Sequence, residues 1–98
     1  MKYAISFDTA AEEHLRALRK FDEIEIRDAI AIRLAHEPTK ETRHRKSTRP
    51  GSRYRRQLSV GEWRVFYDVV EVPLLVTIRA VGEKRGNKLF IAGKEVAL

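Results

Sequence analysis

Apolar and polar residues alternate through residues 53–69, and this pattern predicts a β-hairpin. Gly61 and Glu62 stand between the two alternating arms, where a Gly-X pair is typical of a two-residue type II′ turn. Counting outward from that turn predicts the cross-strand pairs, which are Val60–Trp63, Ser59–Arg64, Leu58–Val65, Gln57–Phe66 and Arg55–Asp68.

The alternation gives this hairpin two unlike faces, because successive side chains of a strand point to opposite sides. One face is apolar with Arg56 as its only charge, and it carries Tyr54, Leu58, Val60, Trp63, Val65, Tyr67 and Val69. The other face is cationic and carries Arg53, Arg55, Gln57, Ser59, Arg64, Phe66 and Asp68. We therefore expect the hairpin to cover a core with one face and to bind an anionic partner with the other.

The N-terminal third of the chain predicts one strand and two helices. Residues 2–7 alternate as a strand does, and residues 9–12 match a capping box for a helix ending near Lys20. Residues 22–25 open a second helix in the same way, which ends near His36 before Pro38. The short link between them implies an antiparallel helical hairpin.

The second helix is apolar over more than one face. Ile24, Ala31 and Ile32 lie outside its main apolar stripe. Two interpretations remain open: the helix is buried more fully than a surface helix, or it presents an apolar patch to a protein partner.

The rest of the chain predicts further strands. Residues 37–52 form a long loop, and residues 74–81 form a nearly continuous apolar run, typical of a strand buried on both faces. We expect residues 82–86 to leave the sheet. Residues 88–96 fit a short strand kinked at Gly93 better than a helix. The order β-α-α-β-β-β, with that short terminal strand, predicts one α+β domain over residues 1–98, with two helices on one face of a mostly antiparallel sheet.

Positive charge is concentrated in one segment. The chain carries a net charge of +6, and residues 43–56 hold seven cations and no acid. Such a cluster is typical of a polyanion-binding site, whereas a solvated basic loop is the alternative. The expected RNA-binding residues are Arg43, His44, Arg45, Lys46, Arg49, Arg53, Gln57 and Phe90.

Several other chemistries are excluded. The chain has no cysteine, no Gly-rich phosphate loop and no histidine–carboxylate set at metal-ligand spacing, so we expect no metal and no cofactor. No apolar run is long enough to span a membrane, and no signal peptide is evident, so a cytoplasmic protein is expected.

Cationic side chains on a sheet can bind phosphate and stabilise the extra charge of a pentacovalent transition state. RNA supplies its own nucleophile, the 2′-hydroxyl, so metal-free cleavage is chemically feasible at such a site. Simple RNA binding requires the same residues.

The chain resembles the RelE/ParE superfamily of bacterial toxins along its whole length. The resemblance is carried by residues 54–58, 63–67 and 78–82, followed by Lys84-Arg85 and Leu89-Phe90. It implies the toxin of a type II toxin–antitoxin system. RelE-like members are ribosome-dependent endoribonucleases that cut messenger RNA, ParE-like members act on DNA gyrase, and a non-catalytic RNA-binding relative is a further alternative.

The resemblance also implies site residues and partners. Catalytic residues would be Arg55, Arg64 and Lys84 or Arg85. Gln57 stands where a second lysine is common, and Phe90 stands at a tyrosine position without its hydroxyl. The implied partners are the ribosome, messenger RNA and a cognate antitoxin, through which a hetero-oligomeric complex would bind operator DNA.

Overall fold

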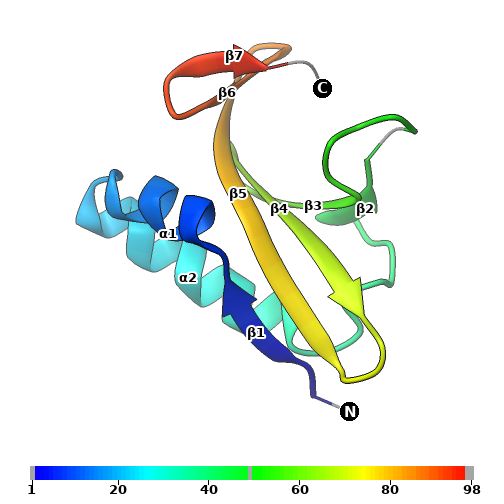
Figure 1. The fold of residues 1–98 in the computed structure, drawn as a ribbon. Coiled ribbons are helices and arrows are strands. Elements are labelled where there is room, and N and C mark those ends of the chain that lie inside the picture. Colours follow the sequence, from blue (N-terminus) through cyan, green and yellow to red (C-terminus); the bar gives the residue numbers. More distant parts are fainter. Residues whose placement is uncertain (1, 49, 97–98) are drawn as a thin grey trace.

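The computed structural model describes residues 2–48 and 50–96 of the protein. Its elements follow one another as β1 (Ala4–Phe7), α1 (Thr9–Arg16), α2 (Lys20–Leu34), β2 (Arg45–Ser47), β3 (Arg56–Val60), β4 (Trp63–Val70), β5 (Leu75–Arg85), β6 (Lys88–Ile91) and β7 (Lys94–Val96). The two helices lie together on one side of the sheet (Figure 1), so the predicted α+β architecture is confirmed. No helix in residues 2–48 and 50–96 is long and apolar enough to cross a membrane.

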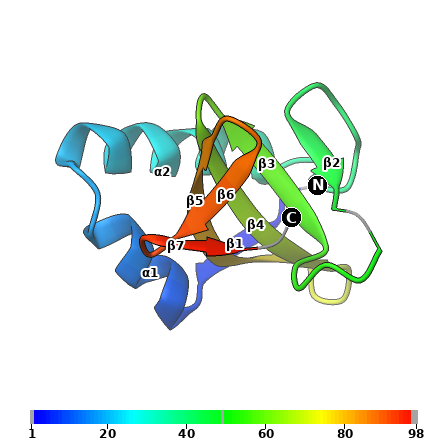
Figure 2. The ribbon, with the colours of Figure 1, turned by 90° about the horizontal axis from the view of Figure 1, so that it is seen from above.

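The sheet is built around β5, the longest strand. Its order is β2-β3-β4-β5-β6-β7, with antiparallel neighbours throughout, and β1 pairs with β5 in parallel. Strand β1 pairs with the first half of β5, at residues 75–78, and β6 pairs with its last residues, 83–85. Seen from above, the helices and β2 lie on opposite sides of the central strands (Figure 2).

The β3–β4 hairpin has the predicted register from Val60–Trp63 to Gln57–Phe66. Gly61 has a φ of +58°, whereas Glu62 has no positive φ, which fits a type II′ turn rather than type I′. The predicted pair between Arg55 and Asp68 is wrong, because β3 begins one residue later, at Arg56.

The core lies between the helices and the apolar face of this hairpin. The fully buried side chains that meet there are Ala11, Leu15, Ile26, Ile30, Leu34, Leu58, Val65, Tyr67, Val76 and Ile78. Tyr67 donates a hydrogen bond to the carbonyl of Pro38 at 2.8 Å, which satisfies its buried hydroxyl. Arg56, the predicted lone charge on this face, donates to the carbonyl of Thr39.

The helix boundaries differ from the predicted ones. The α1 helix is capped by Asp8, whose carboxylate accepts from the Ala11 N–H at 3.1 Å, one residue before the predicted cap. It ends at Arg16, well before Lys20, because the chain already turns at residues 17–19 to start α2. The α2 helix begins at Lys20 and ends at Leu34, so both of its ends lie before the predicted ones.

The outward side of α2 presents apolar side chains to solvent. Phe21 is 74% exposed, Ile24 48% and Ile32 75%, and Ala31 is exposed as well. The interpretation that this helix is buried more fully is therefore wrong. The structure has the alternative, an exposed apolar patch.

Two segments predicted as irregular belong to the sheet, and the predicted short terminal strand is a pair of strands. Residues 45–47 of the long loop form β2, which pairs with β3. Strand β5 continues through residues 82–85, where an exit from the sheet was expected. Residues 88–96 form two strands, joined by a turn in which Ala92 and Gly93 have positive φ.

A β-bulge in β5 decides which face each of its last residues occupies. Tyr67 pairs with Ile78 and Phe66 pairs with Ala80, so Arg79 has no partner in β4. Ile78 faces the core, yet Ala80 packs on the opposite side against Phe66. Every residue after the bulge is therefore on the face opposite to the one that strict alternation would give.

Candidate functional site

A cleft of about 650 Å³ opens on the side of the sheet away from the core. It lies between the segment that leads into β3 on one side and the β6–β7 hairpin on the other. Its lining comes from Lys46, Ser47, Thr48, Ser52, Arg53, Tyr54, Gln57, Arg64, Phe66, Lys84, Leu89, Ile91, Lys94 and Val96. The predicted cationic face of the hairpin thus belongs to a cleft rather than to a flat surface.

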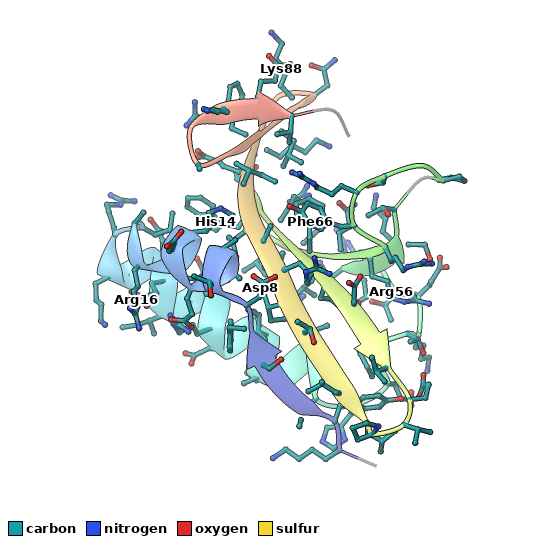
Figure 3. The ribbon with its side chains drawn as sticks, in the orientation of Figure 1. Asp8, His14, Arg16, Arg56, Phe66 and Lys88 are labelled. Atoms are coloured by element: carbon teal, nitrogen blue, oxygen red, sulfur yellow. The ribbon has the colours of Figure 1, made fainter. Side chains whose placement is uncertain are left out.

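The floor of the cleft is apolar. Phe66 is only 3% exposed and packs with Ala80 and Leu89. The ring of Tyr54 stacks on Phe66, with the ring centroids 5.0 Å apart and the planes at 26°. Phe66 lies on the cleft side of β5 (Figure 3). The prediction that Tyr54 belongs to the core is wrong, because residues 53–55 form a bend before β3 and do not continue its alternation.

A glycine allows β6 to lie close to this floor. A Cβ on Gly82 would be 2.8 Å from the side chain of Ile91 and 2.8 Å from the carbonyl oxygen of Phe90. Gly82 is therefore the residue that lets Leu89 and Ile91 close one wall of the cleft.

Positive charge surrounds the apolar floor. Cations reach the cleft from four strands and a loop, and they are Lys46, Arg53, Arg64, Lys84 and Lys94. Among the described residues that line the cleft, none is acidic. This arrangement suits a ligand that combines negative charge with a flat apolar part.

The register of β4 and β5 brings two of these cations together. Arg64 lies opposite Gly82, and Lys84 follows Gly82 by two residues on the same face. The Arg64 Nη1 donates to the carbonyls of Gly61 at 2.8 Å and Trp63 at 2.9 Å, which holds the guanidinium at the hairpin turn. The remaining nitrogens of Arg64 have no acceptor among the described residues, so they can bind a ligand.

Arg85 and Phe90 lie on the opposite side of the sheet. Paired residues of the β5–β6 ladder lie on the same face of the sheet, and Phe90 pairs with Glu83. Arg85 shares that face with Glu83, because it follows Glu83 by two residues. Lys84 pairs with Leu89, and these two side chains lie on the other face. Arg85 binds Glu83 at 2.9 Å and its guanidinium lies 4.6 Å from the ring centre of Phe90. Both side chains line a second cavity, beside α1. Of the predicted pair Lys84 and Arg85, only Lys84 reaches the cationic cleft.

The remaining predicted residues are spread more widely. Arg55 is exposed outside the cleft, and its carbonyl accepts from the Thr48 N–H at 2.9 Å. Arg43 and His44 are exposed as well and do not line the cleft. Arg45 donates to the carbonyls of Arg33 at 2.8 Å and His36 at 3.2 Å, so its charge faces the C-terminus of α2.

Three predicted RNA-binding residues, Lys46, Arg53 and Gln57, line the cleft, and Arg49 lies outside the described residues. Sequence reasoning missed Lys94 and the position of Tyr54. A signal for Lys94 was present: it follows Gly93, where the predicted kink turns the chain back over the sheet.

Comparison with known proteins gives relatives by structure alone. No known family model matches the chain, and no curated protein does either. A chain of the toxin–antitoxin complex RelBE2 from Mycobacterium tuberculosis superposes with a TM-score of 0.71 at 23% identity, over 87% of this chain and 100% of that one. A chain of the archaeal RelE–RelB complex from Pyrococcus horikoshii OT3 superposes with a TM-score of 0.67 at 20% identity, over 88% and 98%.

The chain has a RelE-like fold. In this RelE-like fold the cleft lies where the β3–β4 hairpin, the end of β5 and the β6–β7 hairpin meet. The predicted fold class and the structural likeness thus agree, although they rest on independent evidence.

Proposed function

We propose that the protein is the toxin of a type II toxin–antitoxin pair and that it cleaves messenger RNA on the ribosome. The observation that supports this most directly is the cleft itself, whose five cations surround an aromatic floor with no acid among its described lining residues. Phosphate groups bind to cations such as those at the rim, and unpaired bases stack on aromatic rings such as those of the floor.

The proposed reaction uses the 2′-hydroxyl of the substrate as nucleophile. Its oxygen attacks the adjacent phosphorus while its proton passes to water, and the bond to the 5′-oxygen breaks. Arg64 and Lys84 stabilise the extra negative charge on the phosphorane, and the Lys84 ammonium can donate the proton that the departing 5′-oxygen takes up. The products are a 2′,3′-cyclic phosphate and a 5′-hydroxyl.

A protein partner is also part of the proposal. Phe21, Ile24 and Ile32 expose apolar surface on α2, and α2 packs against the core face of the sheet, away from the cleft. An antitoxin that covered such surface and carried acidic residues into the cleft would prevent RNA binding, because it would neutralise the cations and occupy the cleft. The structural neighbours come from the toxin–antitoxin complex RelBE2 and from the RelE–RelB complex.

The test adds purified protein to ribosomes programmed with a defined messenger RNA and maps the cut ends. We expect cuts in the codon of the A site, with 5′-hydroxyl ends downstream. A matched messenger with one 2′-deoxynucleotide before the cut bond should resist cleavage, because it lacks the nucleophile. Cleavage of that messenger with 5′-phosphate ends would instead indicate attack by an activated water.

A ParE-like action on DNA gyrase is the second candidate, favoured by the position of Phe90 away from the cleft. Intact messenger RNA together with inhibited DNA supercoiling would establish it. Intact messenger RNA and unaffected gyrase would leave a non-catalytic RNA-binding protein.

A further inference from the structure

Tyr54 differs from the other two tyrosines of the chain in where its ring lies. The hydroxyl of Tyr3 donates to Glu71 at 2.5 Å, and that of Tyr67 donates to the carbonyl of Pro38 in the core. Tyr54 lines the cationic cleft, and its hydroxyl has no hydrogen-bond partner among the described residues. It is therefore the tyrosine that a ligand in the cleft can reach.

The ring of Tyr54 is held in place by packing on Phe66 and by hydrogen bonds of the Tyr54 backbone. One face rests on Phe66, which is buried and cannot move aside without disturbing Leu89 and Ala80. The carbonyl of Tyr54 accepts from the hydroxyl of Thr48, and its N–H donates to Ser52 at 3.4 Å. A ring fixed in this way loses little freedom when a second flat group stacks on it.

We propose that Tyr54 forms a nucleobase subsite, in which an unpaired base of single-stranded RNA stacks on the ring face turned away from Phe66. Arg53 and Lys46 hold the flanking phosphates, and Arg64 and Lys84 lie across the same floor. Because every base has a flat π-face, the subsite accepts all four bases with modest preferences. This inference rests on the proposed function, since it assigns RNA as the ligand.

An alternative role for Tyr54 is proton transfer through its phenol. The two roles need different parts of the side chain: stacking needs the ring, and proton transfer needs the hydroxyl. Tyr54→Phe keeps the first and removes the second, Tyr54→Trp enlarges the ring, and Tyr54→Leu removes both.

The experiment measures binding of a short labelled RNA oligonucleotide by fluorescence anisotropy, without ribosomes. Tyr54→Leu should weaken binding by roughly 5- to 150-fold, the range found for loss of one base–aromatic stack. Tyr54→Phe and Tyr54→Trp should bind within about twofold of the wild type. Tyr3→Leu is the matched control, because it makes the same substitution at a tyrosine that does not line the cleft, and it should leave binding unchanged.

A series of oligonucleotides, each with one abasic position, completes the test. One abasic position should weaken binding to the wild type and have no further effect on Tyr54→Leu, since the same stack is already lost. Melting temperatures of all variants show whether they are folded. If Tyr54→Leu unfolds, the abasic series on the wild type still tests the subsite, because equal binding of abasic and intact oligonucleotides would exclude a stacked base.

Three outcomes would overturn the subsite. Tyr54→Leu could bind as tightly as the wild type, the abasic effect could persist in that variant, or Tyr54→Phe could lose cleavage as fully as Tyr54→Leu while binding normally. Failure of the ribonuclease proposal is distinguishable, because binding with these Tyr54 effects but without cleavage leaves the subsite intact. Absence of any RNA binding by the wild type overturns the subsite, whereas mapping of cut ends on programmed ribosomes tests the proposed function separately.

Discussion

The Arg79 guanidinium donates to the carboxylate of Asp68 at 2.7 Å, and its Nε donates to Asp8 at 2.9 Å. Asp68 lies on the same face of β4 as Arg64, four residues further along the strand. Asp68 is thus paired with Arg79, and Arg64 has no acidic partner among the described residues. The two acids raise the pKa of Arg79, mainly through the hydrogen bond that Arg79 donates to Asp68, so the guanidinium stays charged.

Replacement of Arg64 by alanine should therefore affect activity and not folding. The variant loses exposed hydrogen bonds at the turn, which should cost no more than about 1 kcal/mol of stability. Cleavage on programmed ribosomes should fall by about two orders of magnitude or more, as for loss of one preorganised transition-state donor. Arg64→Lys should recover part of this, since a point charge cannot reproduce a bidentate guanidinium.

Arg16→Ala is the matched control for Arg64, because Arg16 is 76% exposed on α1 and distant from the cleft. It should cleave as the wild type does. Full cleavage by a folded Arg64→Ala protein would remove Arg64 from the site and leave Lys84 as its principal cation.

Lys84 and Arg85 form a natural matched pair for a second prediction. They are neighbours in β5, but Lys84 lines the cleft and Arg85 binds Glu83 on the other side of the sheet. Lys84→Ala should reduce cleavage by at least about tenfold, because it removes a charge beside the phosphate. Arg85→Ala loses only an exposed ion pair, which should cost at most about 1 kcal/mol of stability, with cleavage retained. Equal losses in the two variants would mean that the side of the sheet does not matter for cleavage.

The sequence alone left that choice between Lys84 and Arg85 open, and the reason is physical. Strict alternation from Val76 and Ile78 would put Lys84 on the core side, and the bulge at Arg79 reverses this. A bulge is decided by the pairing of two strands and has no local signature in β5. The register of the β3–β4 hairpin could be predicted because Gly61 and Glu62 define its turn locally.

Tyr54 and Arg45 show the same limit of sequence reasoning. Alternation counted back from Leu58 puts Tyr54 in the core, but β3 begins only at Arg56, where β2 pairs with it. Arg45 falls in the basic segment, yet its partners are carbonyls at the end of α2. Such long-range contacts cannot be read from a local pattern, although the order of helices and strands can.

The third prediction is that a variant at Arg45 changes stability, whereas variants of the cations that line the cleft change RNA binding. Arg45→Ala removes charge-assisted hydrogen bonds to the C-terminus of α2 and should lower the free energy of unfolding by about 1–3 kcal/mol. The double variant Lys46→Ala, Arg53→Ala should keep its stability and flatten the salt dependence of RNA binding by about 0.7 per cation removed. Urea unfolding and anisotropy titrations at several salt concentrations measure the two effects. An unchanged slope in the double variant would mean that these cations do not contact phosphate.

The last prediction concerns Tyr67 and alkaline pH. Burial raises the pKa of Tyr67 from 10.0 to about 12, although the charges of Arg56 and Arg45 oppose the shift. In the unfolded chain the phenol loses its proton near pH 10, whereas the folded protein retains it until about pH 12. The folded state therefore binds more protons in that range, and the stability due to the neutral phenol is complete below pH 10 and declines above it.

Tyr67→Phe tests this with nearly the same side-chain volume. At neutral pH the variant should be less stable by about 1 kcal/mol, because the hydrogen bond to Pro38 is lost. Between about pH 10 and 12 the wild type should lose roughly 2–3 kcal/mol more than the variant, so that their curves of unfolding free energy against pH converge and cross. The other ionisable groups are the same in both proteins, so their effects cancel in the difference. Parallel curves would show that the Tyr67 phenol ionises as readily in the folded protein as in the unfolded chain, and that the contact with Pro38 does not seal it from solvent.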